Sequence, residues 1–130
     1  MSCRFAVMSL CVVVLLAGCR RDLVPGPDAP AINEERFAEL REFYATMDPP
    51  AQLGIVTDVL PEHRLAAVGQ IDLGPFREGQ AISFMDSNER LIAHGYIERI
   101  TSRELHVRYE APGREEREPR VGDMAIRFLR

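Results

Sequence analysis

The side chains best suited to acid–base or metal chemistry are three histidines, at positions 63, 94 and 106. His63 lies in a predicted turn, whereas His94 and His106 lie on predicted strands that the fold can bring together. Two imidazoles completed by Glu98 or Glu104 would suit a small metal-assisted hydrolase. Because solvated surface histidines are far more common than metal ligands, our primary expectation is no metal, no cofactor and no enzyme.

Other arrangements that could support catalysis are weaker. Asp58 and Asp72 could pair across the first predicted hairpin as an acid–base couple, but each lies at a strand edge where polar side chains are usual. Ser83, Ser87 and Ser102 have no nucleophile-elbow motif around them and no base nearby in the sequence. The sequence therefore favours a protein without catalytic activity.

The three cysteines lie at positions 3, 11 and 19, so none follows residue 19. Residues 5–18 form an almost wholly apolar run after one positive charge at Arg4. This run is shorter than the roughly 20 residues that span a bilayer as a helix. A charged start, a short apolar middle and small residues at the exit are typical of a secretory signal peptide, predicted here over 1–18.

The exit residues Leu16-Ala17-Gly18-Cys19 resemble the lipobox of bacterial lipoproteins at all four positions. The resemblance implies cleavage between Gly18 and Cys19, palmitate and related lipid on the Cys19 sulfur, and a place in the cell envelope. Several acyl chains give an anchor that does not readily leave a membrane. Arg20 stands where an Asp commonly retains such proteins at the inner membrane, so by analogy we expect the outer membrane, facing the periplasm. An ordinary signal peptide is the alternative.

Residues 19–31 contain three prolines and predict an extended tether behind the acylated cysteine. An amphipathic helix is predicted over 32–48, with Asn33 as the N-cap and Ile32 packing on Phe37. Four apolar residues follow one face at helical spacing: Phe37, Leu40, Tyr44 and Met47. This face is expected to pack on its own domain, with a short coiled coil to a partner as the alternative.

From residue 52 to 130 the pattern changes to short β-rich runs separated by turns. Strands are expected near 53–60, 65–73, 80–86, 91–101, 104–110 and 123–129. The chain also repeats itself, since "GIVTDV" at 54–59 matches "GYIERI" at 95–100. The apolar spacing of three within each run indicates a β-bulge that turns both apolar residues inward.

A Gly-Gln at 79–80 and a Gly-Asp at 122–123 begin the third strand of each half. Two related three-strand units that close on each other predict a mainly β fold, a small five- to six-stranded barrel. This pattern resembles the SH3-like or translation-factor-like barrels of bacterial envelope proteins, including the C-terminal domain of flagellar assembly protein T. The resemblance covers 52–130 and implies an assembly or binding role, but it assigns no site residues.

The net charge of −4 disfavours nucleic-acid binding, which rests on a basic surface. The exposed side chains that we expect to contact a partner are Phe76 and Tyr96, and Phe76 could instead close the barrel as a lid. The sequence thus predicts a non-catalytic binding or assembly module of the envelope, contacting a protein or the cell wall. A metal-assisted hydrolase and a cell-wall-binding SH3-like module remain the alternatives.

Overall fold

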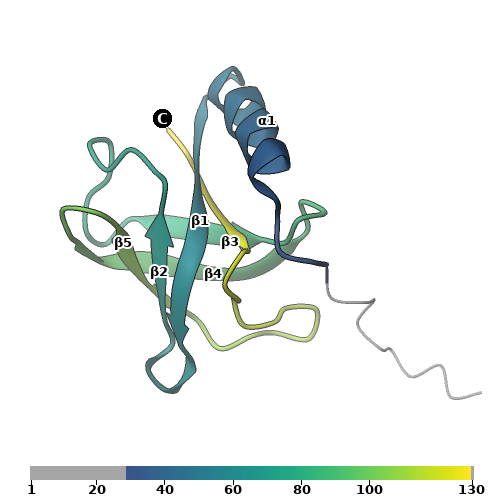
Figure 1. Ribbon diagram of the computed structural model, residues 1–130. Coiled ribbons are helices and arrows are strands. Elements are labelled where there is room, and N and C mark those ends of the chain that lie inside the picture. Colours follow the sequence, from purple (N-terminus) through teal and green to yellow (C-terminus); the bar gives the residue numbers. More distant parts are fainter. Residues whose placement is uncertain (1–28, 130) are drawn as a thin grey trace, which may run out of the picture.

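The computed structural model describes residues 29–129, so the lipobox, Cys19 and most of the predicted tether lie outside the described residues. One helix precedes a closed barrel of six antiparallel strands, which confirms the expected fold class (Figure 1). The elements are α1 Glu34–Ala45, β1 Ala51–Leu60, η1 Pro61–His63, β2 Leu65–Gly69, β3 Ala81–Met85, β4 Leu91–Ile100, β5 Leu105–Tyr109 and β6 Met124–Phe128. Within residues 29–129, no helix is long and apolar enough to cross a bilayer.

The barrel consists of two related halves. The strand order is β1-β2-β5-β4-β3-β6, and β6 pairs back onto β1. The order has a twofold symmetry: if each strand of the first half changes places with its equivalent in the second half, every strand keeps equivalent neighbours. The equivalent strands are β1 and β4, β2 and β5, and β3 and β6. The register has the same twofold symmetry, because Ala66 faces its own counterpart Val107. Ser83 likewise faces its counterpart Ile126, which confirms the two three-strand units.

Both predicted bulges are present at equivalent positions. The register shifts between Val56 and Asp58 in β1 and between Ile97 and Arg99 in β4. Each shift lets two apolar residues three apart face the barrel core, as Val56 and Val59 do. Because the side chains of a regular strand alternate between faces, this spacing would otherwise send one of the two residues outward.

The turns that lead into β3 and β6 are also equivalent. Gly79 and Gly122 have φ angles of 84° and 92°, the left-handed value that favours glycine at this position of a type II turn. The next residues are Gln80 and Asp123, whose side-chain oxygens accept hydrogen bonds from the amide three residues back at 2.9 and 2.7 Å. The repeated glycine and the polar residue after it therefore form the same turn twice.

Two apolar clusters stabilise the fold. One fills the barrel, and the other lies between α1 and the outer face of β1 and β6. Phe37 and Leu40 of α1 are both almost completely buried in this second cluster. The Asn33 side chain accepts a hydrogen bond from the Arg36 amide at 2.8 Å, as predicted for the N-cap. The helix therefore packs on its own barrel.

Three details of the sequence prediction are wrong. The second strand ends at Gly69 rather than 73, because Gln70 has a φ of 53° and turns the chain out of the strand. The helix ends at Ala45, so Met47 lies beyond it and is 38% exposed instead of facing the core. Phe76 is only 1% exposed, because it fills the barrel core, and this burial excludes it as a partner contact.

Gly95 lets β5 approach β4 closely, and its replacement tests the barrel packing. A Cβ atom at Gly95 would collide with the Arg108 carbonyl and the Tyr109 backbone. We expect Gly95→Ala to lower the free energy of unfolding by about 3 kcal/mol in urea titrations. The matched control is Gly113→Ala, whose Cβ would come no closer than 3.7 Å to a neighbour. Equal stabilities of the two variants would contradict this account of the strand contact.

Candidate binding groove

The twofold symmetry of the backbone is broken by side chains on the outside of the barrel. Under α1, Leu53 and Ile126 form one cross-strand pair of apolar residues. The symmetry-related pair on the other side is His94 and Ser83. One half of the barrel therefore carries an apolar face that the helix covers, and the other half carries a more polar one. We call this second face, made by Ala81, Ser83, His94 and Tyr96, the open face.

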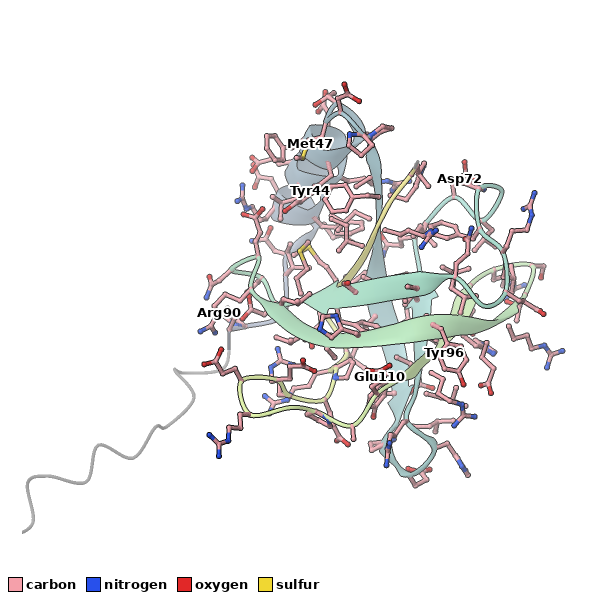
Figure 2. All side chains as sticks on the ribbon, turned by 180° about the vertical axis from the view of Figure 1, so that it is seen from behind. Tyr44, Met47, Asp72, Arg90, Tyr96 and Glu110 are labelled. Carbon is pink, nitrogen blue, oxygen red and sulfur yellow. The ribbon has the colours of Figure 1, made fainter. Side chains whose placement is uncertain are left out.

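A groove of about 630 Å³ begins at the open face and runs along β3 and β6 to the C-terminal end of α1. Figure 2 shows this side of the molecule, with Tyr44 above the front strands and Tyr96 below them. Leu91 and Phe128 are 50% and 43% exposed at the groove, although both are large apolar side chains. The groove is lined by Tyr44, Ala81, Ile82, Ser83, Met85, Glu89, Leu91, Ile126, Arg127 and Phe128.

At the floor of the groove β3 and β6 separate. Ser83 and Ile126 form the last pair of their ladder toward the end of β6, and Ala81 is not paired with Phe128. Instead, the Arg127 guanidinium bridges the gap and donates a hydrogen bond from Nη1 to the Ala81 carbonyl at 2.6 Å. Among the described residues, no carboxylate forms an ion pair with Arg127, whose guanidinium is held by the Ala81 carbonyl instead.

Glu89 and Tyr44 form the other polar end of the groove. The Tyr44 hydroxyl donates to Glu89 Oε1 at 2.8 Å, and Arg36 lies 3.5 Å from the other carboxylate oxygen. Burial, followed by the hydrogen bond to Glu89, raises the pKa of Tyr44 to about 12. The Tyr44 ring also packs edge-on against Phe128, with ring centroids 6.4 Å apart. Both oxygens of Glu89 therefore already have partners within the protein.

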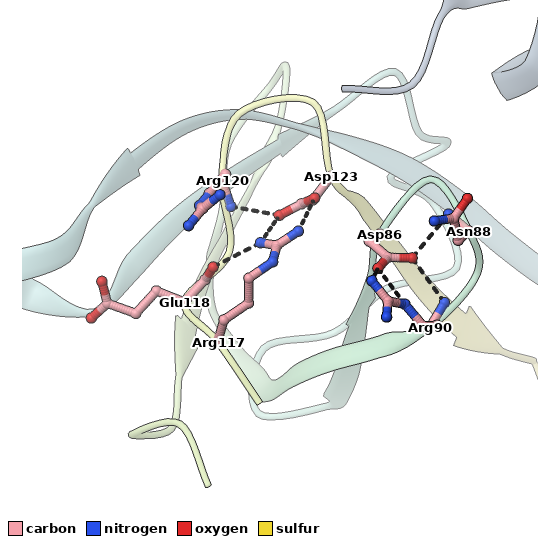
Figure 3. A network of polar contacts seen from close by, with 7 residues as sticks. All are labelled: Asp86, Asn88, Arg90, Arg117, Glu118, Arg120 and Asp123. Atoms are coloured by element: carbon pink, nitrogen blue, oxygen red, sulfur yellow. Dashed lines mark hydrogen bonds and ion pairs between the residues drawn. The ribbon is translucent and has the colours of Figure 1, made fainter. Parts of the chain in front are cut away.

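Two buried carboxylates, which sequence reasoning missed, fix the loops around this end of the barrel (Figure 3). Asp86 accepts hydrogen bonds from the Asn88 and Arg90 amides and from the Arg90 side chain, all at 2.9–3.0 Å. These bonds hold the loop from which Glu89 reaches Tyr44. Asp123 binds Arg117 through both of its oxygens, at 2.7 and 2.8 Å. The sequence predicts a turn between the strands expected near 80–86 and 91–101, but it gives no sign that the Asp86 side chain is buried.

The structure does not bring the two predicted metal-site histidines together. His94 Nε2 lies 3.4 Å from Glu116, and His106 Nε2 lies 2.9 Å from Glu104. On β4, His106 faces Arg99, well along the strand from His94. Within residues 29–129, no group of three His, Cys, Asp or Glu side chains is placed to hold a metal ion. Each histidine instead has a single carboxylate partner.

The side chains of the other catalytic candidates bond to local backbone or to other partners instead of to each other in the described part of the chain. Asp58 accepts a hydrogen bond from the next amide in its strand, and Asp72 accepts one from the Gly74 amide. Ser83 and His94 are cross-strand neighbours, which the sequence did not reveal. In the described part of the chain, however, no hydrogen bond joins them, and the His94 nitrogen nearest a partner faces Glu116. This geometry does not form the serine–histidine pair that nucleophilic catalysis requires.

Tyr96 is 42% exposed on the open face. A partner can therefore reach it, which the prediction of Tyr96 as a contact residue requires. Its neighbour across the strands is Arg108, which binds Glu98 at 2.8 Å. Glu98 therefore has an arginine partner instead of a histidine.

Comparison with known proteins identifies no relative: the chain matches no protein-family model, no curated protein and no solved structure. The similarity to bacterial lipoproteins and to small envelope barrels therefore stays a prediction from the motifs quoted above. The function has to be argued from the groove and from the residues around it.

The burial of Tyr44 and its hydrogen bond to Glu89 together predict a change of stability at alkaline pH. The pKa of Tyr44 is about 12 in the folded chain, against about 10 for an unfolded tyrosine. Its contribution to stability is therefore complete below pH 10 and is lost as the pH rises from 10 to 12. We expect Tyr44→Phe to cost about 1 kcal/mol at pH 8.

The same variant should also show a shallower fall of stability between pH 10 and 12 than the unmodified chain. Denaturant titrations across this range measure both effects. Tyr96→Phe is the matched control, because it leaves the Glu89 contact intact. Parallel stability curves for Tyr44→Phe and the unmodified chain would show that the Tyr44 hydroxyl is not held by Glu89.

Proposed function

We propose that this chain is a lipid-anchored binding module of the bacterial cell envelope that acts without catalysis. The observation that carries the proposal is the groove along β3 and β6, where large apolar side chains stay exposed beside Arg127, which has no ion-pair partner among the described residues. Exposed apolar surface next to a few polar groups is typical of a binding site. The groove lies where β3 and β6 separate beyond the Ser83–Ile126 pair, so both side chains and strand backbone line it.

The described chain enters the fold next to α1, and the groove residue Glu89 contacts side chains from both ends of this helix. The chain enters the fold at Ile32, whose amide donates to the Gly122 carbonyl at 3.2 Å, just before α1 begins. Tyr44 lies in the last turn of this 12-residue helix, about 15 Å beyond Glu34 along its axis. Arg36, in the first turn of the same helix, lies 3.5 Å from Glu89 of the groove lining. The groove therefore extends beside both ends of α1.

The anchor is tested by removing the sulfur that would carry the lipid. We expect Cys19→Ala, expressed as the full chain in a Gram-negative host, to lose labelled palmitate and to leave the membrane fraction. Cys11→Ala is the matched control, because Cys11 lies within the predicted signal peptide and should not change either readout. If Cys19→Ala incorporates as much palmitate as the unmodified chain and stays membrane-bound, the anchor is disproved.

The binding role is tested with a photo-crosslinking amino acid placed in living cells at Leu91, at the groove. We expect a discrete protein adduct from this position, because its side chain is half exposed beside the groove. The same amino acid at Arg103, in the turn between β4 and β5, should give no matching adduct. Absence of any adduct from Leu91 would contradict the role of the groove. Co-sedimentation of the chain with purified peptidoglycan sacculi would indicate the cell-wall-binding alternative.

A further inference from the structure

The two charged residues that line the groove, Arg127 and Glu89, differ in the partners that they already have. The chain has a net charge of −4, yet the one basic residue that lines the groove has no carboxylate partner among the described residues. Glu89, the acidic residue of the lining, already accepts from Tyr44 and pairs with Arg36. Among the described residues, Arg127 is therefore the charged groove residue without an ion-pair partner, and its guanidinium is complementary to a carboxylate.

The structure also holds Arg127 in place for such a contact. Its Nη1 is fixed on the Ala81 carbonyl at 2.6 Å, at the point where β3 and β6 separate. A guanidinium has five N–H donors in a rigid fork, so further donors remain after this bond. Two exposed apolar side chains also line the groove: Phe128, which is next to Arg127 in the chain, and Leu91, at the start of β4. A carboxylate bound here would be flanked by apolar surface.

We propose that the groove binds an acidic, apolar segment of a partner protein, whose carboxylate accepts hydrogen bonds from Arg127. The apolar side chains next to this carboxylate pack between Phe128 and Leu91. The proposal rests on the proposed binding function and specifies the chemistry of the partner. A charge-assisted bond to an arginine gives the contact its orientation, and burial of Leu91 and Phe128 contributes affinity.

The lining of the groove favours a protein segment over a fatty acid, which carries the same carboxylate. A fatty acid needs a continuous apolar channel for its chain, but here Ser83, Glu89 and the Tyr44 hydroxyl interrupt the apolar surface. The same polar groups can serve a peptide backbone and polar side chains. The volume of about 630 Å³ falls within the range of about 300–1,000 Å³ that is common for ligand sites.

The barrel itself shows that a chain segment can pack on this kind of surface. The symmetry-related outer face, with Leu53 and Ile126, receives Phe37 and Leu40 of α1. On the open face the residue equivalent to Ile126 is the smaller Ser83, and Ala81 stands in place of Met124. The backbone shape is thus similar, but the smaller side chains leave room that α1 does not fill.

The test begins with a random heptapeptide library displayed on phage and selected against the purified full chain in detergent. We expect the enriched peptides to share an Asp or Glu next to large apolar residues. The most enriched peptide is then synthesised, with its acidic residue either kept or changed to the amide. Binding to the full chain is measured for both forms by fluorescence anisotropy, with decanoate as a competing fatty acid.

We expect Arg127→Met to lower the affinity for the acidic peptide about tenfold or more. The affinity for the amide form should stay unchanged. Leu91→Glu should also lower the affinity for the acidic peptide, through like-charge repulsion. Because Leu91 is exposed and Arg127 is kept, this second variant tests the groove even if Arg127→Met does not fold. Arg99→Met is the matched control, an exposed arginine on β4 outside the groove lining, and should bind normally.

Enrichment of no peptide, enrichment of peptides without an acidic residue, or unchanged binding in both groove variants would overturn the proposal. Displacement of the peptide by micromolar decanoate would indicate a fatty acid instead and would also overturn it. These failures are distinguishable from failure of the binding role itself. A crosslinked partner at Leu91 that persists in Arg127→Met would retain the binding module and remove only its acidic specificity.

Discussion

Two pairs of backbone hydrogen bonds fix where the third strand of each half begins, and the meeting of β3 and β6 depends on them. Val56 donates to the Asp123 carbonyl at 2.8 Å and accepts from the Gly122 amide at 2.9 Å. Ile97 makes the equivalent bonds to Gln80 and Gly79 at 2.8 and 2.7 Å. Each pair lies directly before a bulge, so it joins the bent strand of one half to the turn that begins a third strand. The turns thereby fix where β3 and β6 start, and hence where they meet.

The bulges and turns could be predicted because their signals are local. An apolar spacing of three within a β-rich run, and a glycine before a Gln or Asp, each specify a backbone geometry within a few residues. The N-cap at Asn33 is local in the same way. The repeat added the long-range information, because two similar units that cannot bury their apolar faces alone are expected to pair with each other. These signals together were sufficient for the closed barrel.

The groove could not be predicted, because it depends on pairings between residues far apart in the chain. The separation of β3 and β6 is visible only once Ser83 is known to face Ile126. The contacts of the histidines could not be predicted either, because His94 lies on β4 and its carboxylate partner Glu116 lies in the loop between β5 and β6. Phe76 stands between a proline and an arginine, a polar loop context that gives no local sign of its burial. Such contacts depend on the register between paired strands, which cannot be read from the composition of the chain or from the spacing of its residues.

The position of Arg127 is the strongest argument that the groove has a function. Its counterpart in the first half is Phe84, a fully buried residue of the barrel core that packs edge-on against Tyr109. Burying an aromatic side chain contributes about 1.5–3 kcal/mol, and the second half forgoes this contribution where it carries an arginine instead. The same backbone accommodates phenylalanine in the other half, so the fold does not require a charge here. The rest of the core follows the rule that inward-facing positions carry apolar residues. A local exception to this rule is expected where a residue serves binding rather than stability.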